Sequence, residues 1–366
     1  MKLYKKNSKI KSITIFILIL LITLSLFSSA GFSVKSTSSN LKNTFYYSYD
    51  DFTELITKLQ YLHPDIFMFY SIGKTYNGRD IWAVKISDNV TINENETEVL
   101  FMGGVHGDEN LGYQTVIYSM NAIIENFSTI KVNLSFSNRI RNIVNNTEIF
   151  FIPMVNPDGV EESNRKNRRI NDCILGDSLF CGVDINRNFG YKWEELDKNP
   201  LKYIYGGFPI PLKSTAKYPF LDFRSIINKG VYRGSAPFSE NESYAIKRFV
   251  ESHSIVIRID YHNPGEKIIY PWSWTKDPTD DNSVFVSIAE NISKINGYKV
   301  LQWSHWYNVI GSSGDWMYGE HNIFPFTIEL SKSYFMNFFP NKIKALEICK
   351  THLLVNLYVS ERAQIL

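Results

Sequence analysis

Cysteine is scarce in this chain. Only three of its 366 residues are cysteine, and no two of them form a Cys-x-x-Cys pair, so a metal site of that kind is excluded. Cys173 and Cys181 are close enough in sequence to form a disulfide in an oxidising compartment. Cys349 lies in a helical pattern, where a cysteine is more often a buried apolar residue than a reactive thiol.

A strong charge of one sign is also lacking. The chain has 39 basic and 37 acidic residues, and beyond residue 40 its one dense basic run is at 165–169. A nucleic-acid partner is not expected, because it would need a broader basic surface. Internal repeats and low-complexity linkers are absent from the structured part. With 44% hydrophobic and 21% charged residues, the composition is that of a globular protein and excludes disorder.

The N-terminus has the pattern of a secretory signal. Basic residues precede an apolar run at 13–27, and Ser28-Ser29-Ala30 supplies small residues for cleavage. The run is shorter than the roughly 20 residues that span a bilayer. We therefore expect a signal peptide at 1–30, a linker at 31–43 and one folded domain at 44–366, exported from the cytoplasm. The alternative is a membrane-anchored form in which this segment is not cleaved.

The hydrophobic pattern of the remaining chain alternates between helices and strands. It predicts helices at 51–62, 111–126 and 342–360, and another through Phe249 that begins at a capping box of Ser239 and Glu242. Short apolar runs predict buried strands at 81–86, 99–105, 148–155, 255–261 and 326–330. Buried strands alternating with helices imply an α/β sandwich with helices on both faces of the sheet.

Polar residues follow or end three of these strands, where α/β folds place their active sites. His106-Gly-Asp-Glu109 follows the strand at 99–105, His262 follows the strand at 255–261, and Glu329 lies in the last strand. Two histidines and a carboxylate make a catalytic zinc set with one position left for water. A histidine at a strand end is also commonly a hydrogen-bonded core residue. Glu329 on an apolar strand is harder to explain structurally, because burying a carboxylate is costly unless it is paired or functional.

From about Tyr46 to the C-terminal helix, the sequence resembles the zinc carboxypeptidases of the carboxypeptidase A and T type. The resemblance implies a three-layer α/β/α sandwich with a mixed, mostly parallel central sheet, and it makes 44–366 a catalytic domain. The matching segments, in the family's order, are Ser71–Arg79, His106–Glu109, Asn156–Gly159, Arg165–Arg168, Asp184–Phe189, His262 with Tyr270–Trp272, Tyr307, Gly311, Asp315–Trp316 and Glu329.

The resemblance also implies the metal chemistry. His106, Glu109 and His262 would bind one Zn²⁺ ion. Asp184 would accept the second ring N–H of His106 and fix its tautomer. Glu329 would be the general base and would pass the proton on to the leaving amine.

A second group of residues would handle the substrate, which the resemblance implies to be the C-terminus of a peptide or protein. Arg165 would stabilise the oxyanion together with the metal. Asn186 and Arg187 would bind the terminal carboxylate, for which the planar guanidinium is well suited. Tyr307 would close over the substrate near the scissile amide.

Specificity is predicted less directly. By resemblance, the pocket for the last substrate residue is floored near Gly314, with Ser273, Ser312, Ser313 and Thr327 on its walls. Position 314 is a glycine and not an aspartate that would select a C-terminal Lys or Arg. The neutral pocket therefore favours substrates with an apolar or aromatic C-terminal residue.

Two other functions remain open at this point. A zinc amidase acting on cell-wall or γ-glutamyl peptides would use the same metal residues, and extra cationic groups in the pocket would favour it. A non-catalytic peptide-binding module of the same fold is the second alternative, although such proteins usually lose a ligand or the base. Nothing in the sequence requires an oligomer, so we expect a monomer.

Overall fold

The computed structural model describes residues 45–128, 134–167, 182–198, 232–332 and 340–366. The predicted signal peptide and linker lie outside these ranges, as do Cys173 and Cys181. Within the described ranges, no helix combines the length and the apolar character needed to cross a membrane.

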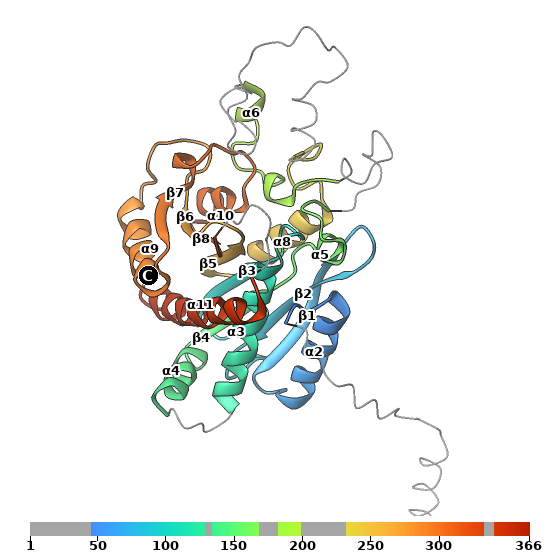
Figure 1. Ribbon diagram of the computed structural model, residues 1–366, viewed down its shortest axis with the longest axis vertical. Coiled ribbons are helices and arrows are strands. Elements are labelled where there is room, and N and C mark those ends of the chain that lie inside the picture. Colours follow the sequence, from blue (N-terminus) through green and yellow to red (C-terminus); the bar gives the residue numbers. More distant parts are fainter. Residues whose placement is uncertain (1–44, 129–133, 168–181, 199–231, 333–339) are drawn as a thin grey trace, which may run out of the picture. The chain divides into compact units, whose positions relative to one another are not determined.

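The centre of the fold is one eight-stranded sheet with the order β1-β2-β4-β3-β5-β8-β6-β7 (Figure 1). Four of its seven strand pairs are parallel and three are antiparallel, which confirms the predicted mixed, mostly parallel sheet. The strands are β1 (Phe67–Lys74), β2 (Asp80–Ile86), β3 (Thr97–Gly103), β4 (Thr147–Ile152), β5 (Ile255–His262), β6 (Lys267–Tyr270), β7 (Lys299–Gln302) and β8 (Phe324–Glu329).

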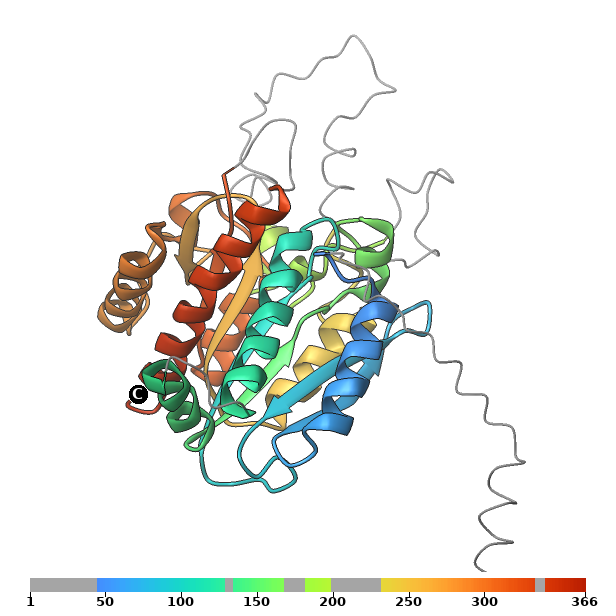
Figure 2. The same cartoon turned by 60° about the horizontal axis from the view of Figure 1, so that its bottom comes forward.

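Helices cover both faces of this sheet. The longer helices are α2 (Tyr49–Leu62), α3 (Asn110–Ser128), α4 (Leu134–Val144), α8 (Asn241–Glu251), α9 (Asn282–Asn296), α10 (Ser313–His321) and α11 (Lys342–Ala363). Shorter elements are α5 (Pro157–Glu162), α6 (Glu195–Lys198) and the 3-10 turns η3 (Ile185–Arg187) and η5 (Trp303–His305). In Figure 2 the blue α2, the teal α3 and the red α11 lie across one face, and the yellow α8 lies behind the sheet.

Successive side chains of the central strands point to opposite faces of the sheet, so the hydrophobic core has two parts. Val99 and Phe101 of β3 pack into the cluster that contains α2, α3, α9 and α11. Leu100 and Met102 of the same strand pack into the cluster that contains α8 and α10. Because successive strand side chains point to opposite faces, a continuous apolar run such as residues 99–102 serves both layers. This explains why the central strands are readable in the sequence as unbroken hydrophobic segments.

Several predicted ends differ from the structure; the strand predicted at 148–155, for example, ends at Ile152. Strand β3 ends at Gly103 instead of Val105, because Gly104 has a φ of 60°, which an extended strand cannot include. The predicted capping box at Ser239 is wrong. Helix α8 begins at Asn241 after Glu240 and has no side-chain cap. The Ser239 hydroxyl donates to the Glu240 carboxylate instead, and Glu242 accepts a hydrogen bond from Asn167.

The topology brings three strand ends to one edge. Strands β3, β5 and β8 are adjacent and parallel, so their carboxyl ends point the same way. His262 and Glu329 are the last residues of β5 and β8 and lie opposite each other in the register. The polar residues that the sequence places at strand ends are therefore neighbours in space.

Candidate active site

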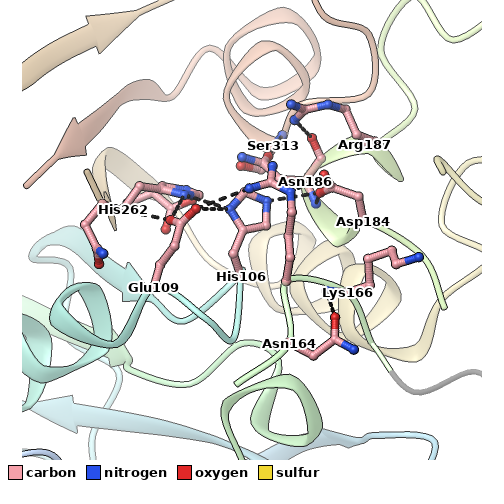
Figure 3. Close-up of polar contacts among 12 residues, drawn as sticks. His106, Glu109, Asn164, Lys166, Asp184, Asn186, Arg187, His262 and Ser313 are labelled. Atoms are coloured by element: carbon pink, nitrogen blue, oxygen red, sulfur yellow. Dashed lines mark hydrogen bonds and ion pairs between the residues drawn. The ribbon is translucent and has the colours of Figure 1, made fainter. Parts of the chain in front are cut away.

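Three metal-ligand side chains converge at the ends of β3 and β5 (Figure 3). The two oxygens of Glu109 lie 2.9 Å from Nδ1 of His106 and 2.8 Å from Nδ1 of His262. The two Nδ1 atoms are 3.2 Å apart. Tetrahedral zinc with Zn–N bonds of about 2.0–2.1 Å places neighbouring ligand atoms about 3.3 Å apart. The two imidazole nitrogens and the carboxylate therefore fit a zinc ion.

The outer nitrogen of each histidine is held by an aspartate. His106 Nε2 lies 3.0 Å from Oδ1 of Asp184, and His262 Nε2 lies 3.1 Å from Oδ2 of Asp260. Both aspartates are fully buried. A carboxylate that accepts the Nε2–H proton leaves the Nδ1 lone pair free for a metal and fixes the ring orientation. Both imidazoles are thus arranged to present Nδ1 to one point.

The charges around these histidines favour a cation. Burial lowers the pKa of His106, but the neighbouring carboxylates, Glu109 among them, outweigh burial and raise it overall. Burial also opposes protonation of His262, yet Asp260 and Glu109 hold its pKa well above the usual value. A site that stabilises positive charge on these nitrogens also stabilises a bound metal cation.

Arg165 joins the metal triad to Asp184. Its Nε donates to Asp184 Oδ2 at 2.9 Å, and its Nη1 donates to Glu109 Oε1 at 3.2 Å. The Arg165 side chain is 30% exposed, so these two carboxylates do not enclose it completely. Arg168, the other arginine of this motif, lies outside the described residues.

Unpartnered donors lie in the turn that begins at Asp184. Asn186 and Arg187 come from the 3-10 turn η3, for which Asp184 is the N-cap. Figure 3 shows them on the opposite side of His106 from Glu109 and His262. Nδ2 of Asn186 and Nε of Arg187 are buried and have no hydrogen-bond partner among the described residues. Arg187 Nη1 donates to its neighbour's carbonyl at 2.7 Å, which fixes the guanidinium.

Glu329 and Tyr307 complete the surroundings. Glu329 is 9% exposed, and burial together with the charge of Glu109 raises its pKa to about 7. Tyr307 follows η5 and packs edge-on against Trp306 with ring centroids 4.8 Å apart. Burial raises the pKa of the Tyr307 phenol, and the charges of Arg187 and Glu329 also act on it. The phenol therefore lies within the electrostatic reach of both Glu329 and Arg187.

Two of the sequence motifs have structural roles. A side chain at Gly107 would overlap the backbone of Gly159, so the turn after His106 packs directly on the Asn156–Gly159 segment. Asp158 in that segment accepts hydrogen bonds from Arg79 Nη1 at 2.6 Å and from the Asn77 amide at 3.0 Å. Together, the two motifs support the loop that carries His106.

A sequence profile of the zinc carboxypeptidase family, Peptidase_M14, matches residues 52–210 and 216–354. The chain belongs to the zinc carboxypeptidase family. The metal of this family is zinc, and His106, Glu109 and His262 are the residues that could hold it.

Curated relatives share this assignment. The chain is 30% identical over 314 residues to the zinc carboxypeptidase of Saccharothrix mutabilis subsp. capreolus, covering 81% of this chain and 65% of the relative. It is 26% identical over 317 residues to the human carboxypeptidase N catalytic chain, covering 78% and 62%. The chain therefore spans slightly less than two thirds of the length of these relatives.

Solved structures support the fold. Carboxypeptidase A from Helicoverpa armigera superposes with a TM-score of 0.67 at 20% identity, over 90% of this chain and 76% of that one. Bovine thrombin-activatable fibrinolysis inhibitor, in complex with tick carboxypeptidase inhibitor, gives 0.67 at 20% identity over 87% and 97%. At this identity the likeness concerns the fold alone.

Two residues of β5 that were not identified from the sequence lie beside the candidate metal site. They are Asp260, which holds His262, and Arg258, which pairs with Asp260 at 2.9 Å. A signal for them exists in the sequence. From Ile257 to His262, apolar and polar residues alternate strictly, so the polar ones share the face of the strand that carries the metal ligand.

Proposed function

We propose that the chain is a secreted metallocarboxypeptidase that hydrolyses the C-terminal peptide bond of peptides and proteins. One observation carries this proposal: the unpartnered N–H groups of Asn186 and Arg187 lie beside a zinc-binding triad. A buried donor without a partner is costly, and a terminal carboxylate would satisfy both donors. An endopeptidase has no use for such a pair next to the metal.

The chemistry divides between the metal and the surrounding side chains. Zinc at His106, Glu109 and His262 would supply Lewis acidity toward the scissile carbonyl and toward a water molecule. Glu329 would accept a proton from that water on its carboxylate and later deliver the proton to the leaving amine. Its raised pKa, about 7, suits a group that must both take and give a proton near neutral pH.

The remaining side chains would position the substrate. Arg165, fixed by Asp184 and Glu109, would donate to the oxyanion that develops on the scissile carbonyl. Tyr307 would cover the bound residue and hydrogen-bond near the scissile amide. Asn186 and Arg187 would fix the terminal carboxylate, so that only the last peptide bond reaches the metal.

The cellular setting is part of the same proposal. Residues 1–30 would be removed on export as a signal peptide, 31–43 would form a linker, and 44–366 would be the catalytic domain of a monomer free of the membrane. Mass analysis of the exported protein tests the cleavage, since a retained N-terminus would indicate an anchored form. Light scattering tests the monomer.

The central experiment is hydrolysis of a blocked dipeptide series by the protein lacking residues 1–30. We expect activity with a free terminal carboxylate, loss of activity on zinc chelation, recovery on adding zinc, and no activity with the C-terminal amide. Equal cleavage of free and amidated peptides would contradict the exopeptidase proposal. Absence of hydrolysis by zinc-loaded protein would favour the cell-wall or γ-glutamyl amidase instead.

A further inference from the structure

A lysine lies beside the proposed base on the same face of the sheet. Lys267 of β6 is the register partner of Glu329 in β8, and Glu329 is in turn the register partner of His262 in β5. Residues directly opposite each other in neighbouring strands point to the same face, and the strands are about 4.8 Å apart. The three side chains therefore form one row that leads from a metal ligand, past the base, to Lys267.

This row lies at the outer end of the strands. The next row inward on the same face, Ile269 and Thr327, is buried. Asn186 and Arg187, the proposed ligands of the terminal carboxylate, are also buried. A substrate bound to them has its last residue inside the site and its scissile bond at the metal and the base. The residue before the scissile bond then lies on the outer side of the row, toward solvent.

The Lys267 ammonium lies on that outer side. Its Nζ donates to the carbonyl of Gly265 at 2.9 Å. Gly265 belongs to the connection between β5 and β6, and its amide donates to the carbonyls of Leu330 and Ser331, beyond the end of β8. Nζ of Lys267 and Cγ of Glu329 both lie 3.3 Å from the point where a Cβ on Gly265 would be. The ammonium and the base thus border the same glycine at the strand ends.

An exposed tryptophan holds the ammonium in this place. Nζ of Lys267 lies 4.4 Å from the centroid of the Trp306 ring, which is a cation–π contact. Trp306 is 39% exposed and packs against Tyr307, the residue proposed to cover the substrate. The positive charge is therefore accessible from solvent, next to the residue that would close over the peptide.

The charge of Lys267 is not balanced by a carboxylate. Of its three N–H donors, one is used by the carbonyl of Gly265, and no ion pair of Lys267 occurs in the part of the chain that the structure describes. Its register partner on the other side, Lys299 of β7, is a second cation and is exposed. This wall is therefore positive, in contrast to the carboxylate-rich metal triad.

We propose that Lys267 is a specificity-determining residue that favours an acidic side chain on the substrate residue immediately before the scissile bond. The proposal rests on the carboxypeptidase function proposed above. A glutamate at that place would reach an ammonium that has an unused N–H donor. A lysine there would be repelled. Because the pair would be partly exposed to water, its effect on the rate is moderate.

The first test compares kcat/KM for blocked peptides that share one C-terminal residue and carry Glu, Gln or Lys immediately before it. Glu and Gln have the same shape, so their ratio isolates the effect of charge. We expect Glu to exceed Gln by about two- to fivefold and Lys to be the poorest. Moving the Glu one residue further from the scissile bond should reduce its advantage. No advantage of Glu, or the same advantage at both positions, would overturn the proposal and leave the carboxypeptidase function intact.

Variants then assign the preference to Lys267. Lys267→Met keeps an apolar stem against Trp306 but removes the charge, so the Glu-to-Gln ratio should fall to about one. Lys267→Arg should retain the preference, and Lys267→Glu should make the Lys peptide better than the Glu peptide. The ratio compares two substrates of one enzyme, so an effect of the variant on Glu329 that is common to both substrates cancels.

Lys299→Met is the matched control, because it removes the same charge one strand further from the base. It should leave most of the preference in place. Equal loss of the ratio in Lys299→Met and Lys267→Met would show that the preference follows the overall charge of the protein and would refute a specific role of Lys267.

Binding separates failure of this proposal from failure of the function. The probes are analogues of the Glu and Gln peptides in which a ketomethylene group replaces the scissile amide, so that they cannot be cleaved. Calorimetry measures their affinity for the zinc-loaded protein. Tighter binding of the Glu analogue by wild type, with equal binding of both by Lys267→Met, would support the proposal even if no peptide is hydrolysed. Equal affinities in wild type, or no binding of either analogue, would overturn it.

Discussion

The two sides of the active site differ in how their polar groups are satisfied. On the metal side, the Nδ1 atoms of His106 and His262 lie 2.8–3.2 Å from each other and from the Glu109 oxygens. Their Nε2 atoms are held by buried aspartates. On the anion side, donors of Asn186 and Arg187 are buried without partners among the described residues.

This difference indicates which kind of ligand completes each side, a metal cation on one and a carboxylate on the other. Each buried, unsatisfied donor costs about 1–3 kcal/mol, and proteins retain such groups at functional sites. The metal side is acidic and held in place by its own contacts. The anion side is cationic and becomes satisfied only when a carboxylate arrives. If the contrast is real, substitutions on the two sides should change different measured quantities.

Replacing the proposed base should have the largest effect. Glu329→Gln keeps the shape of the side chain but cannot accept a proton, so kcat should fall by about 10²–10⁴. Zinc content, measured by atomic absorption, should stay at the wild-type level. The same change at exposed Glu320 on α10 serves as the control. Near-normal turnover in Glu329→Gln would remove Glu329 from the mechanism.

On the anion side, Arg187→Met should act on substrate binding. Losing a charged hydrogen-bonding group worth about 1.5–3 kcal/mol predicts a decrease in kcat/KM of about 10–100-fold. The loss should appear with free terminal carboxylates and should be absent in residual cleavage of amidated peptides. If both substrates are affected equally, Arg187 is a structural residue and the contrast between the two sides fails there.

On the metal side, Asp184→Asn should weaken zinc binding. Carboxylates that hold metal-ligating histidines typically contribute about 10–100-fold in metal affinity, and this one also holds Arg165. Competition with a zinc-binding dye measures the change. Asp80→Asn, at an exposed pair with Lys74, is the matched control. Unchanged zinc affinity would mean that the Asp184–His106 contact does not support the metal.

Glu242 serves as a comparison for the buried, unpartnered groups of the active site, because it is a buried carboxylate for which no ligand is proposed. It is fully buried, and its Oε1 has no partner among the described residues. Burial raises its pKa to about 7, against an ordinary value of 4.5. The folded protein therefore holds a proton there that the unfolded chain releases, and stability falls as the pH rises from about 4.5 through 7.

Glu242→Gln should remove that loss. Since one pKa unit corresponds to about 1.4 kcal/mol, and structural relaxation reduces the effect, we expect the variant to gain roughly 1–2 kcal/mol over wild type between pH 5 and pH 8. Urea unfolding at both pH values measures this, with exposed Glu251→Gln as the control. A gain that is independent of pH would indicate that Glu242 is already ionised in the folded state.

Much of the fold could be read from the sequence because its strongest signals are periodic. The buried strands β2 to β5 and β8 and the helices α2, α3 and α11 follow from apolar spacing, with ends that differ by a few residues. The edge strands β1 and β7 were not predicted, because half-exposed residues give them no clean apolar run. Helix α10 was not predicted because its sequence, which begins with Ser313-Gly314, has no amphipathic pattern.

The candidate site likewise has features that the sequence predicted and features that it did not. The residue types of His106, Glu109, His262 and Glu329, placed at strand ends, indicate a metal hydrolase before any contact is known. The capping box predicted at Ser239 was wrong because it depends on contacts and not on residue types. Its hydroxyl and the Glu242 carboxylate are used by Glu240 and Asn167, partners that the local sequence does not reveal.

The sequence by itself determined the layer architecture, the family and a candidate set of metal ligands, because periodicity and side-chain chemistry are local properties. Only the tertiary structure decided which polar groups are satisfied. Arg258 and Ser313 are 55 residues apart, and whether a guanidinium at position 258 is paired or free depends on how β5, β8 and α10 pack. Burial turns that difference in pairing into a difference in free energy.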